Sequence, residues 1–251
     1  MGVKKLFDLS GKTALVTGGS RGLGLQIAEA LIEMGAKVAI TARKKDELEE
    51  AKQHLGASAR AFVCDIGKRE SIPPLLEQCG RIEILVNNAG ATWGAPAEEH
   101  PLDAWDKLMN VNLTGLFLLS QLAAKKYMIP AKWGRIVNVA SIAGLLGQDP
   151  RFAPTAAYTA TKHGVVGLTR QLAAEWGVHG ITVNAICPGF FPSKMTRATL
   201  ATAGELVKEW TPTRRLGDDE DLKGLAVLLA SDASRHINGQ AIAVDGGASI
   251  V

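Results

Sequence analysis

The chain has few of the residues that mark metal-binding, disulfide-rich or nucleic-acid-binding proteins. Its 251 residues include only three cysteines, Cys64, Cys79 and Cys187, and no Cys-x-x-Cys pair, which predicts free thiols in a reducing compartment. The five histidines complete no metal-ligand motif, so we expect no metal site. The 28 Lys and Arg residues exceed the 25 Asp and Glu residues by only three, which argues against a broad nucleic-acid surface.

The sequence also lacks a long hydrophobic run. The long uncharged stretch at residues 108–124 contains five polar side chains and is too short to span a membrane. The first residues, Met-Gly-Val-Lys-Lys-Leu, lack the apolar segment of a signal peptide. We therefore expect a cytoplasmic protein that binds neither membranes nor nucleic acid.

Hydrophobic residues, at 47%, are abundant enough to bury a large core, and short apolar runs alternate with helical periodicity. We predict helices at residues 22–34, 45–54, 102–128, 156–178 and 218–231. We predict strands at residues 12–17, 37–41, 60–64, 82–86, 135–139, 181–186 and 242–244. No linker divides the chain, so we expect residues 1–251 to form a single α/β domain, a doubly wound Rossmann-type fold with a parallel sheet and helices on both faces.

A glycine-rich segment, Thr17-Gly18-Gly19-Ser20-Arg21-Gly22-Leu23-Gly24, joins the first predicted strand to the first predicted helix. Gly18 permits a tight turn, Gly22 lets the backbone approach a pyrophosphate, and Gly24 lets the helix pack close to the strand. The helix N-terminus would then offer unpaired N–H groups to the phosphates. This context predicts a dinucleotide site, and the alternative is an ordinary glycine-rich turn.

The T-G-x-x-x-G-x-G spacing resembles that of the classical short-chain dehydrogenase/reductase family. Later motifs follow in the family's order over nearly the whole chain: Asn87-Asn88-Ala89-Gly90 after the fourth strand, Asn112 in Val-Asn-Leu-Thr-Gly, Ser141 at the end of the fifth strand, Tyr158 and Lys162 in Tyr-x-x-x-Lys, Pro188-Gly189 after the sixth strand, and Asp245-Gly246-Gly247 near the C-terminus. The chain is similar to 3-oxoacyl reductase and gluconate 5-dehydrogenase-like members. The resemblance implies a nicotinamide-dependent oxidoreductase.

Tyr158 and Lys162 are four residues apart on a predicted helix, so their side chains share a face. We expect the lysine ammonium to lower the phenol pKa from its usual value of about 10, so that Tyr158 exchanges a proton with a substrate oxygen. The resemblance implies that Ser141 orients that oxygen, that Lys162 also holds the nicotinamide ribose, and that Asn112 anchors a water molecule. The alternatives are a strand-end cap at Ser141, a solvated Lys162, a buried amide at Asn112 and a packing tyrosine.

The segment between Ser141 and Tyr158 is a few residues longer than is common in the family. The additional residues fall within residues 148–157, where Pro150 and Pro154 favour an irregular loop beside the active site.

Ala42 stands where NAD-preferring relatives usually carry Asp, and Arg43 and Lys44 follow it. With Arg21 in the glycine loop, these cations would suit a 2′-phosphate, which predicts NADP(H) as the cofactor. The alternative is that Arg43 and Lys44 simply begin a solvated helix. The resemblance implies the following cofactor-binding residues: Gly18, Ser20, Arg21, Gly22, Leu23, Gly24, Arg43, Asp65, Ile66, Asn88, Ala89, Gly90, Tyr158, Lys162, Pro188, Gly189 and Ser193.

Substrate contacts are expected from segments that follow the fourth, fifth and sixth strands. The candidates are mostly aromatic: Trp93, Phe152, Phe190, Phe191, Met195 and Trp210. We expect a lid at about residues 190–215 and an apolar pocket that takes a ketone with hydrophobic substituents. Arg151, Arg197 and Arg214 are alternative contacts for an acyl-carrier phosphate or a sugar acid. The aromatic residues could equally belong to the core or to an interface.

The leading hypothesis is an NADPH-dependent carbonyl reductase that transfers hydride to a ketone, with Tyr158 as the general acid. The alternatives are an NAD-dependent alcohol, polyol or sugar-acid dehydrogenase working oxidatively and a non-catalytic dinucleotide sensor. Enoyl reductases space their Tyr and Lys more widely. The resemblance also implies a homotetramer held by the two long helices and the C-terminal strand.

Overall fold

In the computed structural model, which describes residues 2–149, 151–152 and 154–251, seven parallel strands form one sheet in the order β3-β2-β1-β4-β5-β6-β7. The strands are β1 (Thr13–Thr17), β2 (Lys37–Ala42), β3 (Ala59–Val63), β4 (Ile84–Asn87), β5 (Gly134–Val139), β6 (Ile181–Pro188) and β7 (Ala241–Val244). Each begins and ends within two residues of its predicted bounds. The predicted doubly wound parallel fold is confirmed. Pro150, expected in the long loop before Tyr158, lies outside the described residues.

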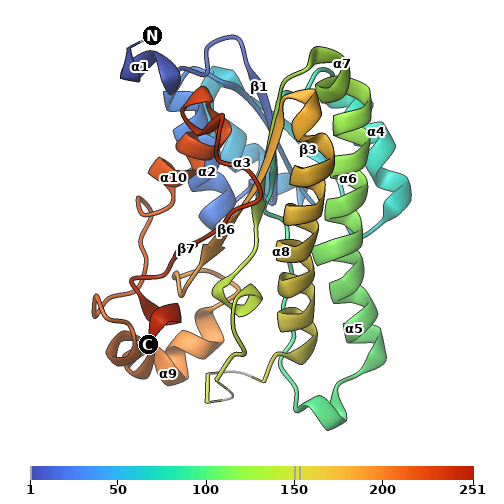
Figure 1. Cartoon of the computed structure of the whole chain (residues 1–251). Coiled ribbons are helices and arrows are strands. Elements are labelled where there is room, and N and C mark those ends of the chain that lie inside the picture. The colour runs from blue at the N-terminus through green and yellow to red at the C-terminus, as the bar shows by residue number, and fades with distance from the viewer. Residues whose placement is uncertain (1, 150, 153) are drawn as a thin grey trace.

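Helices cover both faces of the sheet (Figure 1). α2 (Gly22–Glu33), α3 (Lys45–Leu55) and α10 (Lys223–Ala230) lie on one face, and α4 (Ile72–Cys79), α6 (Gly115–Ala123) and α8 (Ala156–Trp176) lie on the other. Successive strand side chains point to opposite faces, so Val16 of β1 belongs to the core cluster of the first face and Leu15 to that of the second. Burial on both sides explains why the central strands are continuous apolar runs.

α4 and α10 differ from the sequence expectation at their first residues. α4 was not predicted, and Pro73 and Pro74 fall within it. Both prolines lie in the first turn, where the missing N–H groups need no partner inside the helix. α10 begins at Lys223 rather than at residue 218, because the Asp218 N–H donates to the Asp221 carboxylate and holds this segment in a turn.

The predicted helix at residues 102–128 is helical but not uniform. α5 (Leu102–Met109) runs through a wide π-helical turn, Asn110–Thr114, into α6, and a second wide turn, Ala124–Met128, leads to α7 (Ile129–Ala131). The first wide turn contains Asn112, whose side chain bonds to the backbone of another segment. Such turns are frequent at functional sites.

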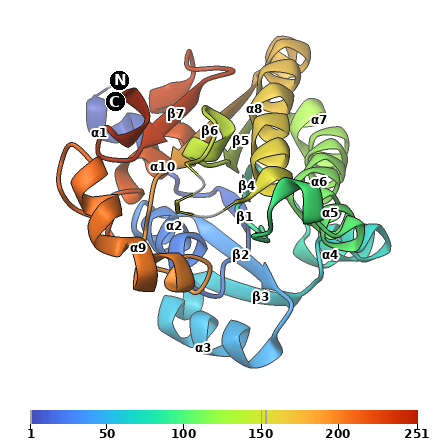
Figure 2. The same ribbon diagram turned by 90° about the horizontal axis from the view of Figure 1, so that it is seen from below.

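The carboxyl ends of the strands meet at one end of the molecule, which Figure 2 shows face on. The strand order reverses between β1 and β4, so the segments after these strands diverge and leave a crevice. α9 (Arg197–Trp210) lies at this end, whereas the short α1 (Val3–Leu6) lies at the opposite one (Figure 1). Within the described part of the chain, none of the helices has the length and apolarity to cross a bilayer.

Candidate active site

The glycine loop after β1 is tied to the segment after β4 by Asn88 and Thr17. The Asn88 amide nitrogen donates to the carbonyl oxygens of Thr17 at 3.0 Å and Gly18 at 3.1 Å. In return, the Thr17 hydroxyl accepts from the backbone N–H groups of Asn88 at 3.0 Å and Ala89 at 2.9 Å. The two loops that flank the crevice are therefore fixed relative to each other.

Glycine is needed at two positions of this loop for different structural reasons. A Cβ atom on Gly24 would collide with the Gly18 carbonyl oxygen and the Asn88 amide, so only glycine fits this approach of helix to loop. Gly22 has φ of +53°, and a Cβ atom there would meet no protein atom within 4 Å. Gly22 at the start of α2 therefore faces open space, where the helix N-terminus could receive an anion.

Three ionic side chains lie together beside the loop. Glu47, in the first turn of α3, contacts the Arg21 guanidinium at 2.5 Å and the Lys44 ammonium at 3.0 Å. The hydrogen bond from Lys44 and the charge of Arg21 lower the Glu47 pKa below its usual value. Arg43 is exposed next to them. Glu47 was not predicted from the sequence, although an acidic residue one turn after two cations indicates such an ion pair.

Ser141, Tyr158 and Lys162 come together where β5 ends. Ser141 follows the strand, and its hydroxyl oxygen accepts from the Ala143 N–H at 3.1 Å. Lys162 is only 5% exposed, and its ammonium donates to the Val139 carbonyl at 2.8 Å and lies 5.5 Å from the centre of the Tyr158 ring. The spacing of four residues on α8 gives the lysine and the tyrosine this common face.

The pKa values of this group differ from the expectation. Burial raises the pKa of Tyr158 above its usual value, and the opposing effect of the neighbouring Ser141 hydroxyl does not cancel it. Burial also lowers the pKa of Lys162 to about 8. The expected lowering of the Tyr158 pKa by Lys162 is not found, because desolvation of the phenolate raises this pKa. Tyr158 holds its proton at neutral pH.

Asn112 is buried and supports the segment after β4. Its amide oxygen accepts from the Ala91 N–H at 2.8 Å, and its amide nitrogen donates to the Ala91 carbonyl at 2.9 Å and to the Thr161 hydroxyl at 3.0 Å. These bonds fit the buried-amide alternative and place the segment after β4 beside Lys162. A Cβ atom on Gly90 would lie 3.8 Å from the Lys162 ammonium nitrogen.

The other expected cofactor residues lie around the crevice and have partners within the protein. The Asp65 carboxylate accepts from the Gly67 N–H at 3.0 Å, and Ile66 is buried. The Gly189 N–H donates to the Val244 carbonyl at 3.0 Å. The Ser193 hydroxyl oxygen accepts from the Thr196 N–H at 3.2 Å, just before α9 begins. These residues shape the crevice. In the portion of the chain that is described, no group of side chains that could hold a metal ion occurs.

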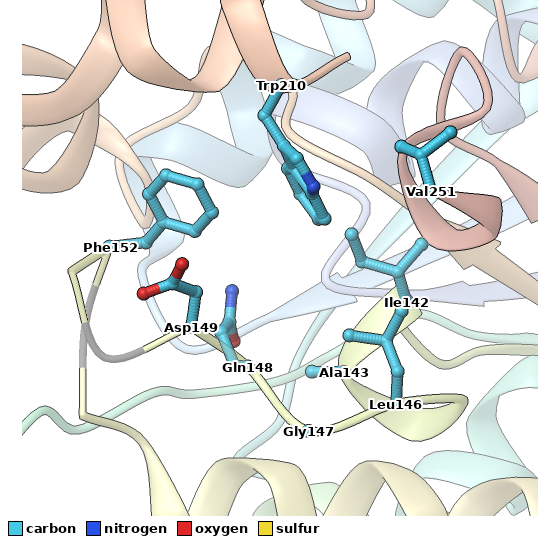
Figure 3. A pocket seen from close by; sticks show the side chains of 9 residues that line it. All are labelled: Ile142, Ala143, Leu146, Gly147, Gln148, Asp149, Phe152, Trp210 and Val251. Atoms are coloured by element: carbon cyan, nitrogen blue, oxygen red, sulfur yellow. The ribbon is translucent and has the colours of Figure 1, made fainter. Parts of the chain in front are cut away.

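A cavity of about 260 Å³ begins at Ile142 and Ala143, the two residues that follow Ser141 (Figure 3). Of the expected substrate residues, Phe152 and Trp210 line it, and Phe190 packs edge-on against Phe152 at 5.5 Å. Phe191 is 4% exposed and lies in the main core, where it packs against Gly217. Trp93 and Met195 are exposed side chains, and neither is among the lining residues. The full lining is Ile142, Ala143, Leu146, Gly147, Gln148, Asp149, Phe152, Trp210 and Val251.

Residues 12–204 match the family model described as short chain dehydrogenase. The chain is 40% identical over 256 residues to a gluconate 5-dehydrogenase of Gluconobacter oxydans, covering 98% of this chain and 97% of that protein. It is 37% identical over 248 residues to a 3-oxoacyl-[acyl-carrier-protein] reductase of Vibrio harveyi, covering 97% of this chain and 100% of the other. A crystal structure of a gluconate 5-dehydrogenase from Burkholderia cenocepacia, in complex with NADP and tartrate, is similar with a TM-score of 0.91, 36% identity and full coverage of both chains.

Proposed function

Because the chain belongs to the short-chain dehydrogenase/reductase family, whose members oxidise alcohols or reduce ketones, we propose that it is an NADPH-dependent carbonyl reductase. The observation that carries the proposal is the grouping of Ser141, Tyr158 and Lys162 at the end of β5, with a phenol that keeps its proton at neutral pH. A protonated Tyr158 is suited to give a proton to a carbonyl oxygen rather than to take one from an alcohol.

The chain's own residues position the ketone and supply the proton. The Ser141 hydroxyl oxygen accepts from the Ala143 N–H, and its hydrogen bond with Tyr158 keeps both hydroxyl groups together, so that both can reach one substrate oxygen. Tyr158 transfers its phenol proton to the same oxygen, and the nearby Lys162 ammonium stabilises the phenolate that remains. Bound NADPH would supply the hydride for the carbonyl carbon, so that the ketone becomes a secondary alcohol.

The crevice fits a dinucleotide with a 2′-phosphate. Gly22 faces open space at the start of α2, which suits a pyrophosphate, and Arg21 and Lys44 form a cationic group beside the end of β2. A similar gluconate 5-dehydrogenase was solved with NADP, which supports the same cofactor here. A bound 2′-phosphate would compete with Glu47 for both cations.

The pairing of Glu47 with Arg21 and Lys44 also favours a second candidate, an NAD-dependent alcohol dehydrogenase working oxidatively. If Glu47 keeps both cations, the phosphate gains little and the dinucleotide without it binds as well. The two candidates differ in cofactor preference and in direction, so kinetics with both cofactors separates them.

A cofactor exchange tests the proposed function. The purified chain is expected to oxidise NADPH with at least one ketone of a mixed panel, at a kcat/KM about tenfold or more above that with NADH. The double variant Ala42→Asp with Arg43→Ala is expected to reverse this preference, because a carboxylate at the end of β2 accepts from the ribose hydroxyls and repels the phosphate. A wild-type preference for NADH, unchanged in the double variant, would support the second candidate.

The rate of ketone reduction is expected to fall as the pH rises through about 8. Lys162 has a pKa lowered to about 8, so its charge is present below this pH and is lost above it. The phenolate left at Tyr158 then loses its stabilising partner. A kcat profile between about pH 6 and pH 10 measures the fall. In Lys162→Arg the guanidinium stays charged, so the decline is expected to move to higher pH; an unmoved decline would assign it to another group.

We also propose that the enzyme is a cytoplasmic homotetramer. α5 and α6 carry exposed apolar side chains, among them Leu102 at 79% and Phe117 at 38% exposure, and β7 forms one edge of the sheet. Exposed apolar side chains and an open strand edge are features that assembly would cover. Light scattering measures the mass of the purified protein in solution. Four times the mass of one chain is expected, and the mass of a monomer or a dimer would contradict the proposal.

A further inference from the structure

The cavity that begins at Ile142, directly after Ser141, has two chemically different walls. Ile142, Leu146 and Trp210 provide apolar and aromatic surface, whereas Gln148 and Asp149 provide an amide and a carboxylate. Figure 3 shows the side chains of Gln148 and Asp149 pointing from their loop toward Phe152 and Trp210. The lining of the cavity is therefore more polar than the apolar pocket expected from the sequence.

The charge in this wall is already balanced inside the loop. The Arg151 guanidinium donates to both carboxylate oxygens of Asp149, at distances from 2.5 to 3.1 Å, and the Arg151 N–H donates to the same group at 2.9 Å. This pairing lowers the pKa of Asp149, so the carboxylate is ionised at neutral pH. Lysine and arginine are absent from the described residues that line the cavity.

An anionic substrate fits this arrangement poorly. A substrate carboxylate that enters the cavity meets the Asp149 carboxylate, and it gains Arg151 only by displacing Asp149 from its bonds. A hydroxyl group meets no such competition. It can donate to a lone pair of Asp149 that Arg151 leaves open, and it can accept from the amide nitrogen of Gln148, whose amide oxygen accepts from Thr155 at 3.2 Å.

The size of the cavity and its aromatic wall set a second limit. A volume of about 260 Å³ accommodates a short carbon chain with its hydroxyl groups. Trp210 of α9 and Val251 bound it on one side. Aromatic rings such as Trp210 and Phe152, 5.3 Å apart, give an apolar surface for the C–H groups of a polyol.

We propose that the substrate is a small, uncharged ketone that carries several hydroxyl groups, bound through Gln148 and Asp149 and reduced to the corresponding polyol. This assignment rests on the proposed function, because it supplies the substrate for the same carbonyl reduction. The ketone carbon would gain the hydride of NADPH and its oxygen the Tyr158 proton, and the Tyr158 phenolate would then take a proton from solvent; the products are the polyol and NADP⁺. Asp149 is a specificity-determining residue that excludes carboxylates.

Matched pairs of substrates test the proposal in the oxidative direction with NADP⁺ at raised pH. Threitol and threonate, xylitol and xylonate, and glucitol and gluconate each differ only by a terminal CH₂OH group or carboxylate. In every pair that reacts, the neutral polyol is expected to have a kcat/KM higher by about tenfold or more. A preferred carboxylate in any pair would overturn the assignment.

The variant Asp149→Asn is expected to change kcat/KM in opposite directions for aldonates and for polyols. It removes one negative charge and frees Arg151, so kcat/KM for the aldonates is expected to rise about tenfold, mainly through KM. For the polyols kcat/KM is expected to fall, since a charged acceptor is lost. Asp8→Asn, which changes a carboxylate near α1 at the opposite end of the molecule, is the control and is expected to leave the ratio unchanged. An unchanged ratio in Asp149→Asn would overturn the role of this residue.

Failure of this inference is distinguishable from failure of the proposed function. If the chain reduces hydrophobic ketones with NADPH but converts none of the polyols, the reductase proposal stands and the substrate assignment is wrong. If no ketone or polyol is converted with either cofactor, the proposed function itself fails.

Discussion

Replacement of Tyr158 by Phe is expected to lower kcat for ketone reduction by about 10³-fold while NADPH still binds. The variant keeps the ring that lies beside Lys162 and removes only the hydroxyl group whose proton the substrate oxygen receives. Phenylalanine has no donor at this position, so the substrate oxygen loses its proton source. Steady-state kinetics gives kcat, and the quenching of protein fluorescence by NADPH gives the binding constant.

The other tyrosine of the chain provides a matched control. The Tyr127 hydroxyl donates to the Leu76 carbonyl at 2.9 Å. This bond lies away from the crevice, on the face of the sheet that α4, α6 and α8 cover. Tyr127→Phe is expected to keep kcat and to lose about 1 kcal/mol of unfolding free energy, the usual worth of one hydrogen bond. Turnover by Tyr158→Phe at a rate close to that of the wild type would remove Tyr158 from the proton-donor role.

The fold was predictable from the sequence because its strands are buried on both faces. β1 and β4 are short apolar runs without the alternation that an exposed strand needs, and their order with the helices predicts a parallel sheet. α4, which was not predicted, shows the limit of such signals. A pair of prolines breaks a helix in its interior but is tolerated in its first turn. Where the helix begins relative to the prolines therefore decides which of these outcomes occurs.

The grouping of the site residues was predictable, whereas their electrostatics was not. Ser141, Tyr158 and Lys162 occur at recognisable places relative to strands, but the sign of the Tyr158 pKa shift depends on burial, which spacing does not encode. The bonds of Glu47 to Arg21 and of Asp149 to Arg151 depend on side-chain directions at a helix start and in a loop. Phe191 likewise follows β6 as expected of a substrate residue, yet it turns into the core.

Replacement of Gly24 by Ala is expected to cost about 2 to 3 kcal/mol of unfolding free energy, as overpacked sites do, and to weaken NADPH binding by at least about tenfold. The added Cβ would collide with the Gly18 carbonyl, which is backbone and cannot rotate away. That carbonyl is held by the Asn88 amide, and the Gly18 N–H is held by the Thr41 carbonyl at 2.7 Å. Relief of the collision therefore moves the loop that would bind the pyrophosphate. Urea unfolding and fluorescence titration with NADPH measure the two effects.

Gly224, in the first turn of α10, offers a control whose replacement by Ala is expected to change the unfolding free energy in the opposite direction. A Cβ atom there would meet no protein atom within 4 Å, so Gly224→Ala is expected to stabilise the chain by about 0.5 to 1 kcal/mol, since alanine loses less backbone entropy in a helix. Both variants add the same methyl group near a helix start, and only Gly24 lies against the loop after β1. Equal stability changes in the two would mean that helix propensity, not the close approach to Gly18, explains Gly24. A stable Gly24→Ala that binds NADPH normally would show that the glycine loop does not position the cofactor.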